Sequence, residues 1–343
     1  MIKEIDLEKL ILIAGGHSAF QLLWAGVQQG VFDQLSENPG MDRAELCEKI
    51  GLQDYPAQIL LTGLTALGLI RKDGDMYFNA PLTEQMLVSG KEGSGAPILG
   101  WQAQIVYPGL KHFVESLRQS TNVGLEEFPG QGNTLYERLT SHPGLEQVFQ
   151  DAMCALSLQA NDHLRHAYDF SRFSHIADIG GGDGTNAIAL AKHYPDLRVT
   201  VFDYPSVCEI ARQKVAEAGL GDRVSVCPGD LMRDPFPPDI DSVIYCHVLP
   251  IWSQENMLKL LGKTHASLPK GGSALIFNMM GNDDETGPLS TALGNLYFLA
   301  IASGQGMLHP WKVYEASLRQ AGFSTIERIS GLPLDHGLIV AEK

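Results

Sequence analysis

The chain of 343 residues lacks the marks of a secreted or membrane-bound protein. Its cysteines are odd in number and scattered without a C-x-x-C pair, which argues against a disulfide framework or a structural zinc site and favours a reducing cytoplasm. The N-terminus has no basic segment of the kind that begins a signal peptide, and no run reaches the roughly 18 apolar residues that a membrane span needs. We therefore expect a cytoplasmic protein without a membrane partner. The cysteines are Cys47, Cys154, Cys208, Cys227 and Cys246.

Positive charge is also scarce. Lysine and arginine total 25 against 40 aspartates and glutamates, for a net charge of -15, and no basic block offsets this balance. Such a surface argues against nucleic acid as a partner. The acidic run Asp283-Asp284-Glu285 has no accompanying histidine pair or paired carboxylates at metal-ligand spacing, so we expect a solvated loop and no metal site.

One stretch, from His175 to Pro205, carries most of the chemical information. It reads as a short apolar strand, a turn rich in glycine, a helix, and a second apolar strand that ends on Asp203. A glycine turn at a helix N-terminus, with an acid at the tip of the next strand, is the general nucleotide site of doubly wound sheets. The acid is expected to bind the ribose hydroxyls.

Two kinds of nucleotide are compatible with this turn. Residues 182–187 satisfy the dinucleotide pattern GxGxxA, although a match of this length is a weak signal. The fuller pattern Asp178-x-Gly180-x-Gly182-x-Gly184 resembles motif I of class I S-adenosylmethionine (SAM) methyltransferases. The resemblance implies that Asp178 and the turn hold the amino-acid end of SAM. A pyrophosphate would be repelled by a carboxylate at Asp178, which disfavours NAD and FAD.

The first hundred residues predict a winged helix. Helices are expected over residues 18–35, 41–50 and 58–69, followed by a hairpin over 69–78 with an Asp-Gly turn. A winged helix can bind DNA, which leaves a SAM-sensing DNA-binding regulator as a remote alternative. After Gln58, however, the third helix has no side chain suited to reading bases, so packing or dimerisation is expected.

A resemblance then covers nearly the whole chain. The segments AFQLLWAGVQQGVFDQL and LTALGLIRKDGDMYFNAPLTEQ resemble the dimerisation domain of the acetylserotonin and caffeic acid O-methyltransferases. The resemblance implies an α/β fold: a Rossmann-like SAM methyltransferase sheet over residues 169–343, an N-terminal all-α winged-helix-like dimerisation domain over 1–98, and a helical linker and substrate lid over 99–168. It also implies a homodimer through the N-terminal domain, a small-molecule substrate, SAM as cofactor and S-adenosylhomocysteine as product.

The same resemblance assigns candidate binding residues. For SAM they are Asp178, Gly180, Gly182, Gly184, Asp203, Asp230, Leu231, Met232 and Cys246. For the substrate they are His112, Met153, Trp252, Met279, Met280, Tyr297 and Phe298. For each aromatic residue the alternative is ordinary core packing.

The catalytic residues of that family are missing. Its members read VLHDWSDE after the fourth strand, with the histidine as general base, whereas this chain has Pro250 and Ile251 in place of the His-Asp pair. The glutamate that would orient the histidine falls on Leu308, and an acid expected after the fifth strand is Asn278. His247 and His309 are the candidate catalytic residues that remain, with His112 as a further candidate for a base.

Three reactions stay open. Our prediction is O-methylation of a small aromatic or conjugated secondary metabolite, because an acidic hydroxyl needs little help when proximity and orientation carry the reaction. The alternatives are C-methylation, and a SAM-binding enzyme of the cyclase or pericyclase kind that transfers no methyl group.

Overall fold

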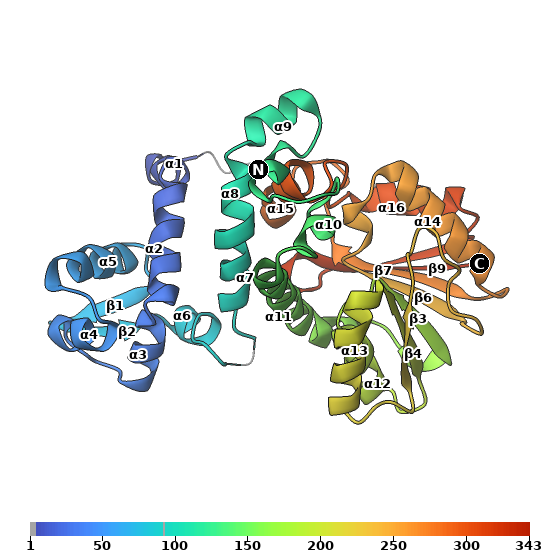
Figure 1. The fold of residues 1–343 in the computed structure, drawn as a ribbon, viewed down its shortest axis with the longest axis horizontal. Helices are drawn as coiled ribbons and strands as arrows, with labels where there is room; N and C mark the ends of the chain where they lie inside the picture. The colour runs from blue at the N-terminus through green and yellow to red at the C-terminus, as the bar shows by residue number, and fades with distance from the viewer. Residues whose placement is uncertain (1–4, 92) are drawn as a thin grey trace. The chain divides into compact units, whose positions relative to one another are not determined.

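The computed structural model describes residues 5–91 and 93–343, and the chain divides into two compact units, residues 1–103 and 104–343 (Figure 1). The boundary lies close to the predicted end of the first domain. A separate lid domain over residues 99–168 stays a prediction.

The N-terminal unit is built from helices and one small hairpin. Its described elements are α1 (Leu7–Ala14), α2 (Gly16–Gln28), α3 (Val31–Glu37), α4 (Arg43–Ile50), α5 (Asp54–Ala66), β1 (Ile70–Asp73), β2 (Met76–Asn79), α6 (Pro81–Met86) and α7 (Ala96–Trp101). The single helix predicted over residues 18–35 is wrong, because Gly30 takes a left-handed φ of 68° and separates α2 from α3.

The core of this unit gathers the apolar faces of α3, α4, α5 and the hairpin, with side chains such as Phe32, Leu46 and Leu61 at most 1% exposed. Helix α1 contributes no buried residue. Within the described ranges, no single helix is long and apolar enough to cross a membrane. Helices α1 and α2 taken together have the length and composition of a membrane span, but the pair is bent by 68°.

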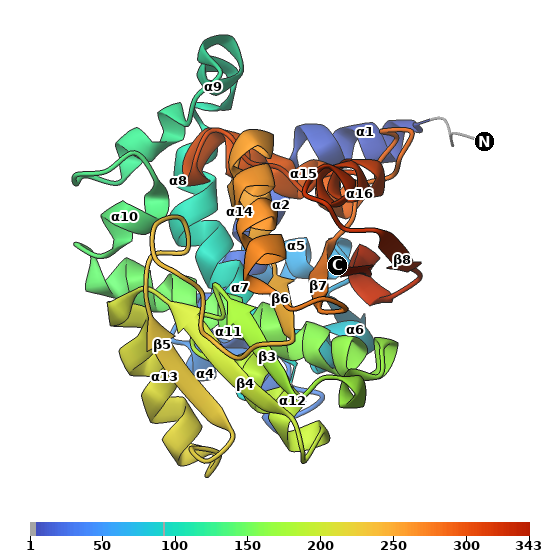
Figure 2. The ribbon, with the colours of Figure 1, turned by 90° about the vertical axis from the view of Figure 1, so that its right-hand side faces the viewer.

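The second unit is organised by a seven-stranded sheet. The strands are β3 (His175–Ile179), β4 (Arg198–Asp203), β5 (Val224–Pro228), β6 (Ser242–Cys246), β7 (Ser273–Met279), β8 (Thr325–Ile329) and β9 (His336–Glu342). They lie in the order β5-β4-β3-β6-β7-β9-β8, parallel except for β9, which is antiparallel to both of its neighbours. Figure 2 shows β4, β3, β6 and β7 side by side. The predicted Rossmann-like fold is confirmed.

Helices cover both faces of this sheet (Figure 1). Alternate strand residues pack on one face with α11 (Pro143–Ala167), α12 (Thr185–His193) and α13 (Pro205–Glu217). The other strand residues pack with α14 (Gln254–Ser267) and α16 (Trp311–Gln320) on the opposite face. The remaining α-helices are α8 (Tyr107–Leu110), α9 (Phe113–Gln119), α10 (Leu135–Leu139) and α15 (Leu289–Tyr297). The inward-facing strand residues are mostly apolar, and the buried polar residues among them include Thr200, Ser242 and Ser273.

Candidate functional site

The glycine turn lies at the topological switch point of the sheet, because β3 has β4 on one side and β6 on the other. Gly180, Gly182 and Gly184 take left-handed φ values of 71°, 57° and 80°. A Cβ atom at Gly180 would also meet Val248 at 2.7 Å. These positions therefore require glycine, and the turn delivers the chain to the N-terminus of α12, where ligands of doubly wound folds bind.

Asp178, the last residue but one of β3, is a fully buried carboxylate, and neither of its oxygens has a hydrogen-bond partner within the described part of the chain. Burial raises its pKa to about 7, and the charges of Asp203 and Asp183 add to this effect. A buried carboxylate without a partner is costly. A cationic ligand group would supply the missing partner, so the site fits the ammonium of SAM.

Asp203 ends β4 and is tied to the glycine turn. Its Oδ2 atom accepts a hydrogen bond of 2.8 Å from the backbone N–H of Gly182, and its Oδ1 atom accepts one of 2.7 Å from the N–H of Tyr204. The carboxylate is therefore held beside the glycine turn, and its role toward the ribose stays a prediction.

The other predicted SAM residues follow the neighbouring strands. Asp230 lies just beyond β5 and accepts a hydrogen bond of 2.8 Å from the backbone N–H of Met232. Leu231 and Met232 are half-buried against the α14 and α16 face. Cys246 is buried at the end of β6, where desolvation and the charge of Asp178 raise the pKa of its thiol. Together with the glycine turn, these residues lie at the carboxyl ends of neighbouring parallel strands.

Sequence reasoning missed a polar cluster that braces the turn. The ammonium of Lys214, on α13, pairs with Asp183 of the turn and lies 3.5 Å from the Sγ atom of Cys154 on α11. Asp183 also accepts hydrogen bonds from the backbone and the hydroxyl of Thr185, at 3.0 and 2.6 Å. The ion pair lowers the pKa of Asp183 against the effect of burial. The local sequence around Lys214 does not predict its ion pair with Asp183.

The first catalytic candidate, His247, follows β6 with a left-handed φ of 61°. Its Nε2 atom lies 2.9 Å from the Nε2 atom of His336, and the His336 ring stacks on Phe277 at 5.0 Å. Desolvation and the neighbouring His336 lower the pKa of His247 to about 3. An imidazole as weakly basic as that of His247 is a poor proton acceptor for a phenol. Its partner His336 was not among the site residues predicted from the sequence.

The second candidate, His309, is 7% exposed, and its Nε2 atom has no hydrogen-bond partner in the described ranges. Burial lowers its pKa to about 4. Pro250 and Leu308, which occupy the positions of the expected histidine and glutamate, are both buried. Asn278 is fully buried, and both polar atoms of its amide lack a hydrogen-bond partner among the residues that the structure describes.

The predicted substrate residues occupy several segments. Met153 on α11, Trp252 and Met279 are half-buried, whereas Met280 is 2% exposed. Tyr297 donates a hydrogen bond of 3.4 Å to the hydroxyl of Tyr136, and the Tyr297 ring packs against Phe298 at 5.3 Å. Tyr136 was not among the residues predicted from the sequence. His112 is bound to Glu127 at 2.8 Å. Its ring is thereby engaged in local packing, and its role toward a substrate stays a prediction.

Comparisons with known proteins converge on one family. The family model described as the O-methyltransferase domain matches residues 109–324. The L-tyrosine C(3)-methyltransferase of Streptomyces lavendulae is 38% identical over 343 residues, covering 99% of this chain and 93% of that protein.

Two solved structures are similar along their whole length. The apo form of the SAM-dependent methyltransferase SibL has a TM-score of 0.85 and 38% identity, and the match covers 98% of this chain and 99% of that one. Human N-acetylserotonin methyltransferase in complex with SAM has a TM-score of 0.88 and 26% identity, with 100% and 99% covered.

Proposed function

The chain belongs to the O-methyltransferase family of SAM-dependent enzymes, and we propose that it methylates a small phenol at the ring carbon beside the hydroxyl. The enzyme class and the cofactor, SAM, follow from the family. The acceptor atom and the substrate class are our proposal. They rest on the missing histidine base and on the near relative that methylates carbon.

The chain's own residues would hold SAM at the carboxyl edge of the sheet. Asp178 would face its ammonium, the turn at Gly180 and Gly182 would receive its amino-acid end, and Asp203 would accept from its ribose hydroxyls. Asp230 with Leu231 and Met232 would cover the adenine. When bound, SAM supplies an electrophilic methyl group on a sulfonium, a strong leaving group.

The single observation that carries the proposal is Pro250. O-methylation of a neutral hydroxyl benefits from a base, because the oxygen must lose its proton as it attacks. Proline can neither accept nor donate a proton, and Leu308 removes the residue that would orient a base. Transfer to the ring carbon needs no base at that position: the new carbon–carbon bond forms first, and the ring proton leaves afterwards to restore aromaticity.

The relative from Streptomyces lavendulae points in the same direction. As its name states, that enzyme methylates carbon C(3) of L-tyrosine, the ring position beside the hydroxyl. We therefore take L-tyrosine as the first substrate to test, with simpler phenols after it. Incubation with SAM carrying a carbon-13 methyl, followed by NMR of the product, tests the proposal. A methyl carbon bonded to the ring supports it, and a methyl bonded to oxygen contradicts it.

O-methylation is the second candidate, favoured by the family model itself. It requires a phenol that is already acidic, so that proximity to the methyl group suffices. The same NMR measurement separates the two candidates.

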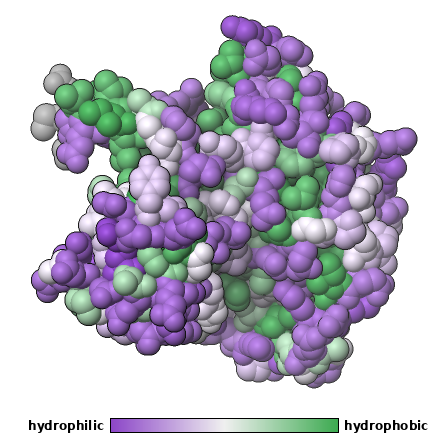
Figure 3. Space-filling model, turned by 60° about the vertical axis from the view of Figure 1, so that its left-hand side comes forward, coloured by the Kyte–Doolittle hydropathy of each residue, from purple (hydrophilic) through white to green (hydrophobic). Residues whose placement is uncertain are grey.

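We further propose a homodimer through the N-terminal unit. Helix α1 leaves Leu7, Leu10, Ile11 and Ile13 between 51% and 72% exposed. Figure 3 shows a group of apolar side chains at its upper left, on the N-terminal unit. An apolar surface of this kind favours burial against a second copy.

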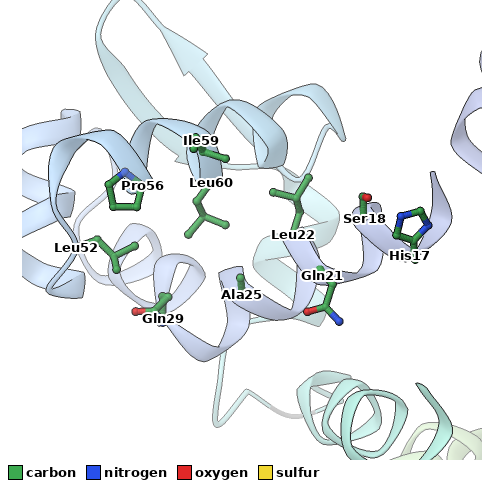
Figure 4. Close-up of a pocket in the computed structure, with 10 residues that line it drawn as sticks. All are labelled: His17, Ser18, Gln21, Leu22, Ala25, Gln29, Leu52, Pro56, Ile59 and Leu60. Carbon is green, nitrogen blue, oxygen red and sulfur yellow. The ribbon is translucent and has the colours of Figure 1, made fainter. Parts of the chain in front are cut away.

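A groove in the same unit supports this pairing. It has a volume of about 430 Å³ and lies between α2 and α5 (Figure 4). Leu22 and Ala25 line one side and Ile59 and Leu60 the other. The exposed face of α5 carries Tyr55 and Ile59 and no positive charge, which favours a protein partner over DNA.

We also propose a cytoplasmic location, which agrees with five cysteines that form no disulfide bond.

A further inference from the structure

Several buried polar atoms near the carboxyl edge of β7 have no hydrogen-bond partner among the described residues. They are both amide atoms of Asn278, Nε2 of His309 and Nε1 of Trp252. Buried polar side chains in native proteins are nearly always paired with protein or with a bound molecule. This group of atoms, separate from Asp178, offers hydrogen-bond partners for a second polar ligand.

The fold brings these groups to one face of the sheet. Along β7, the alternate residues Ala274 and Ile276 pack on the face covered by α14 and α16, and Asn278 continues that row. Tyr314, on α16, belongs to the same cluster, and Trp252 packs against it. Asn278 is thus placed where the sheet ends and the substrate residues begin.

His309 joins the group through the backbone. Gly281, three residues after Asn278, donates a hydrogen bond of 3.0 Å to the carbonyl oxygen of His309 and forms a bridge with Pro310. The His309 ring then lies 5.6 Å from the ring of Tyr314. Two separate segments, the end of β7 and the segment before α16, therefore supply unpaired polar atoms to the face of the sheet that Tyr314 also covers.

The chemistry of these groups specifies what they bind. A side-chain amide offers a donor and an acceptor, the Nε2 atom of a neutral imidazole offers one or the other according to its tautomer, and none of the three side chains carries a charge at neutral pH. A carboxylate would leave the amide oxygen of Asn278 unpaired, and an ammonium would leave the N–H groups of Asn278 and Trp252 unpaired. A hydroxyl both donates and accepts, so it satisfies the amide and the imidazole together.

We propose that Asn278, assisted by His309, holds the hydroxyl of the phenol substrate by hydrogen bonds and sets the choice of acceptor atom. The inference rests on the proposed function and deepens it. The amide oxygen accepts from the substrate O–H, and the amide N–H donates to the substrate oxygen. Because an amide does not remove a proton, the oxygen stays protonated and occupied, and the ring carbon beside it meets the methyl group.

The step balances without a further reactant. The bond between the ring carbon and the methyl forms as the bond between sulfur and the methyl breaks, and its electrons stay on sulfur. The proton on that ring carbon then passes to solvent while its bonding electrons restore the aromatic ring. Asn278 is unchanged, which distinguishes its role from that of a general base.

The test compares the affinities of the enzyme for pairs of ligands that differ only in the hydroxyl. Binding of L-tyrosine and L-phenylalanine, and of tyramine and phenethylamine, is measured by calorimetry on the full-length enzyme saturated with S-adenosylhomocysteine. We expect the wild type to prefer the hydroxylated member of a pair by about tenfold, the upper range for a net hydrogen bond. In Asn278→Leu this preference should disappear, and in His309→Phe it should shrink.

The controls separate the two proposals. Affinity for S-adenosylhomocysteine in Asn278→Leu must equal that of the wild type, which shows that the variant folds; Asn278→Ser is the second variant if it does not. If the wild type binds no member of either pair, the proposed substrate class is wrong. If it binds them without a hydroxyl preference, or if Asn278→Leu keeps that preference, the role of Asn278 is overturned.

Discussion

The Nε2 atoms of His247 and His336 lie 2.9 Å apart, and this pairing determines what either ring can do. The Nδ1 atom of His336 lies 3.1 Å from the carbonyl oxygen of Pro333, which only accepts, so Nδ1 carries a hydrogen. The Nε2 atom of His336 is then the acceptor, and His247 donates to it. Both rings are neutral, and His247 uses its Nε2 hydrogen to bind His336.

This pairing predicts an acid-sensitive stability. The folded pKa of His247, about 3, is below the unfolded value of about 6.5, so the unfolded chain binds more protons within that window. The free energy of unfolding should therefore fall as the pH drops from 6.5 toward 3. In His247→Phe the loss between pH 7 and pH 4 should be smaller by at least about 1.4 kcal/mol, the value of one pKa unit.

Urea denaturation at the two pH values measures this difference. His193→Phe, which replaces an exposed histidine, is the matched control. Equal losses in His247→Phe and the wild type would contradict the assignment of a neutral buried pair. Turnover of His247→Phe should stay within about tenfold of the wild type, equivalent to about 1.4 kcal/mol.

We expect Asp178 to lower the stability of the ligand-free protein and to raise its affinity for SAM. Its folded pKa of about 7 exceeds the ordinary value of 3.8, so its stabilising contribution is complete below about pH 4 and is lost as the pH rises to 7. At pH 8, ligand-free Asp178→Asn should melt at a higher temperature than the wild type. Its affinity for SAM should fall by at least about 30-fold, or about 2 kcal/mol, because a buried charge pair loses one partner.

Thermal unfolding with and without SAM follows both effects. Asp222→Asn, at an exposed carboxylate, should change neither. A variant at Asp178 that is destabilised without ligand and still binds SAM normally would refute this description of the turn.

Local patterns predicted the strands of the sheet and the glycine turn. The turn, its two acids and the succession of strands and helices along the chain are properties of short stretches, since hydrophobic alternation and glycine positions involve neighbouring residues. The family resemblance supplied the remaining candidate SAM residues, whose role stays a prediction. The break at Gly30 could not be separated from a continuous helix, because the apolar period persists across it.

Partners that are distant along the chain could not be predicted. His336 is 89 positions from His247, and Lys214 is 31 positions from Asp183. Such contacts depend on strand order and helix placement, which a single sequence does not supply. The unpaired state of Asn278 is likewise visible only when every neighbour has been placed.

Lys214 should matter for SAM although it lies outside the expected motif. It holds Asp183, and through it the turn, while contacting Cys154 on the helix that carries Met153. Lys214→Met should raise the KM for SAM by about tenfold, or about 1.4 kcal/mol, and leave kcat nearly unchanged. Lys214→Arg should recover part of this loss.

Steady-state kinetics with varied SAM provide the measurement. Lys192→Met, at an exposed lysine in the last turn of α12, serves as the control. An unaltered KM in Lys214→Met would show that the turn keeps its shape without the ion pair.

The exposed face of α1 should hold two copies together. Ile13→Glu places a charge where the proposed dimer buries an apolar side chain that is 61% exposed in one chain. Size-exclusion chromatography with light scattering should find a dimer for the wild type and a monomer for Ile13→Glu. Glu8→Lys, on the same helix, should remain dimeric. A monomeric wild type, or a dimeric Ile13→Glu, would argue against this surface.

The central claim is that a member of an O-methyltransferase family, without its histidine base, transfers the methyl group to carbon. Its most direct test uses L-tyrosine with deuterium at both ring positions beside the hydroxyl, incubated with SAM and the wild-type enzyme and analysed by mass spectrometry. We predict a methylated product that retains one of the two deuterium atoms, because the ring carbon that gains the methyl must lose its own. A methylated product that retains both would place the methyl on oxygen or nitrogen and contradict the account.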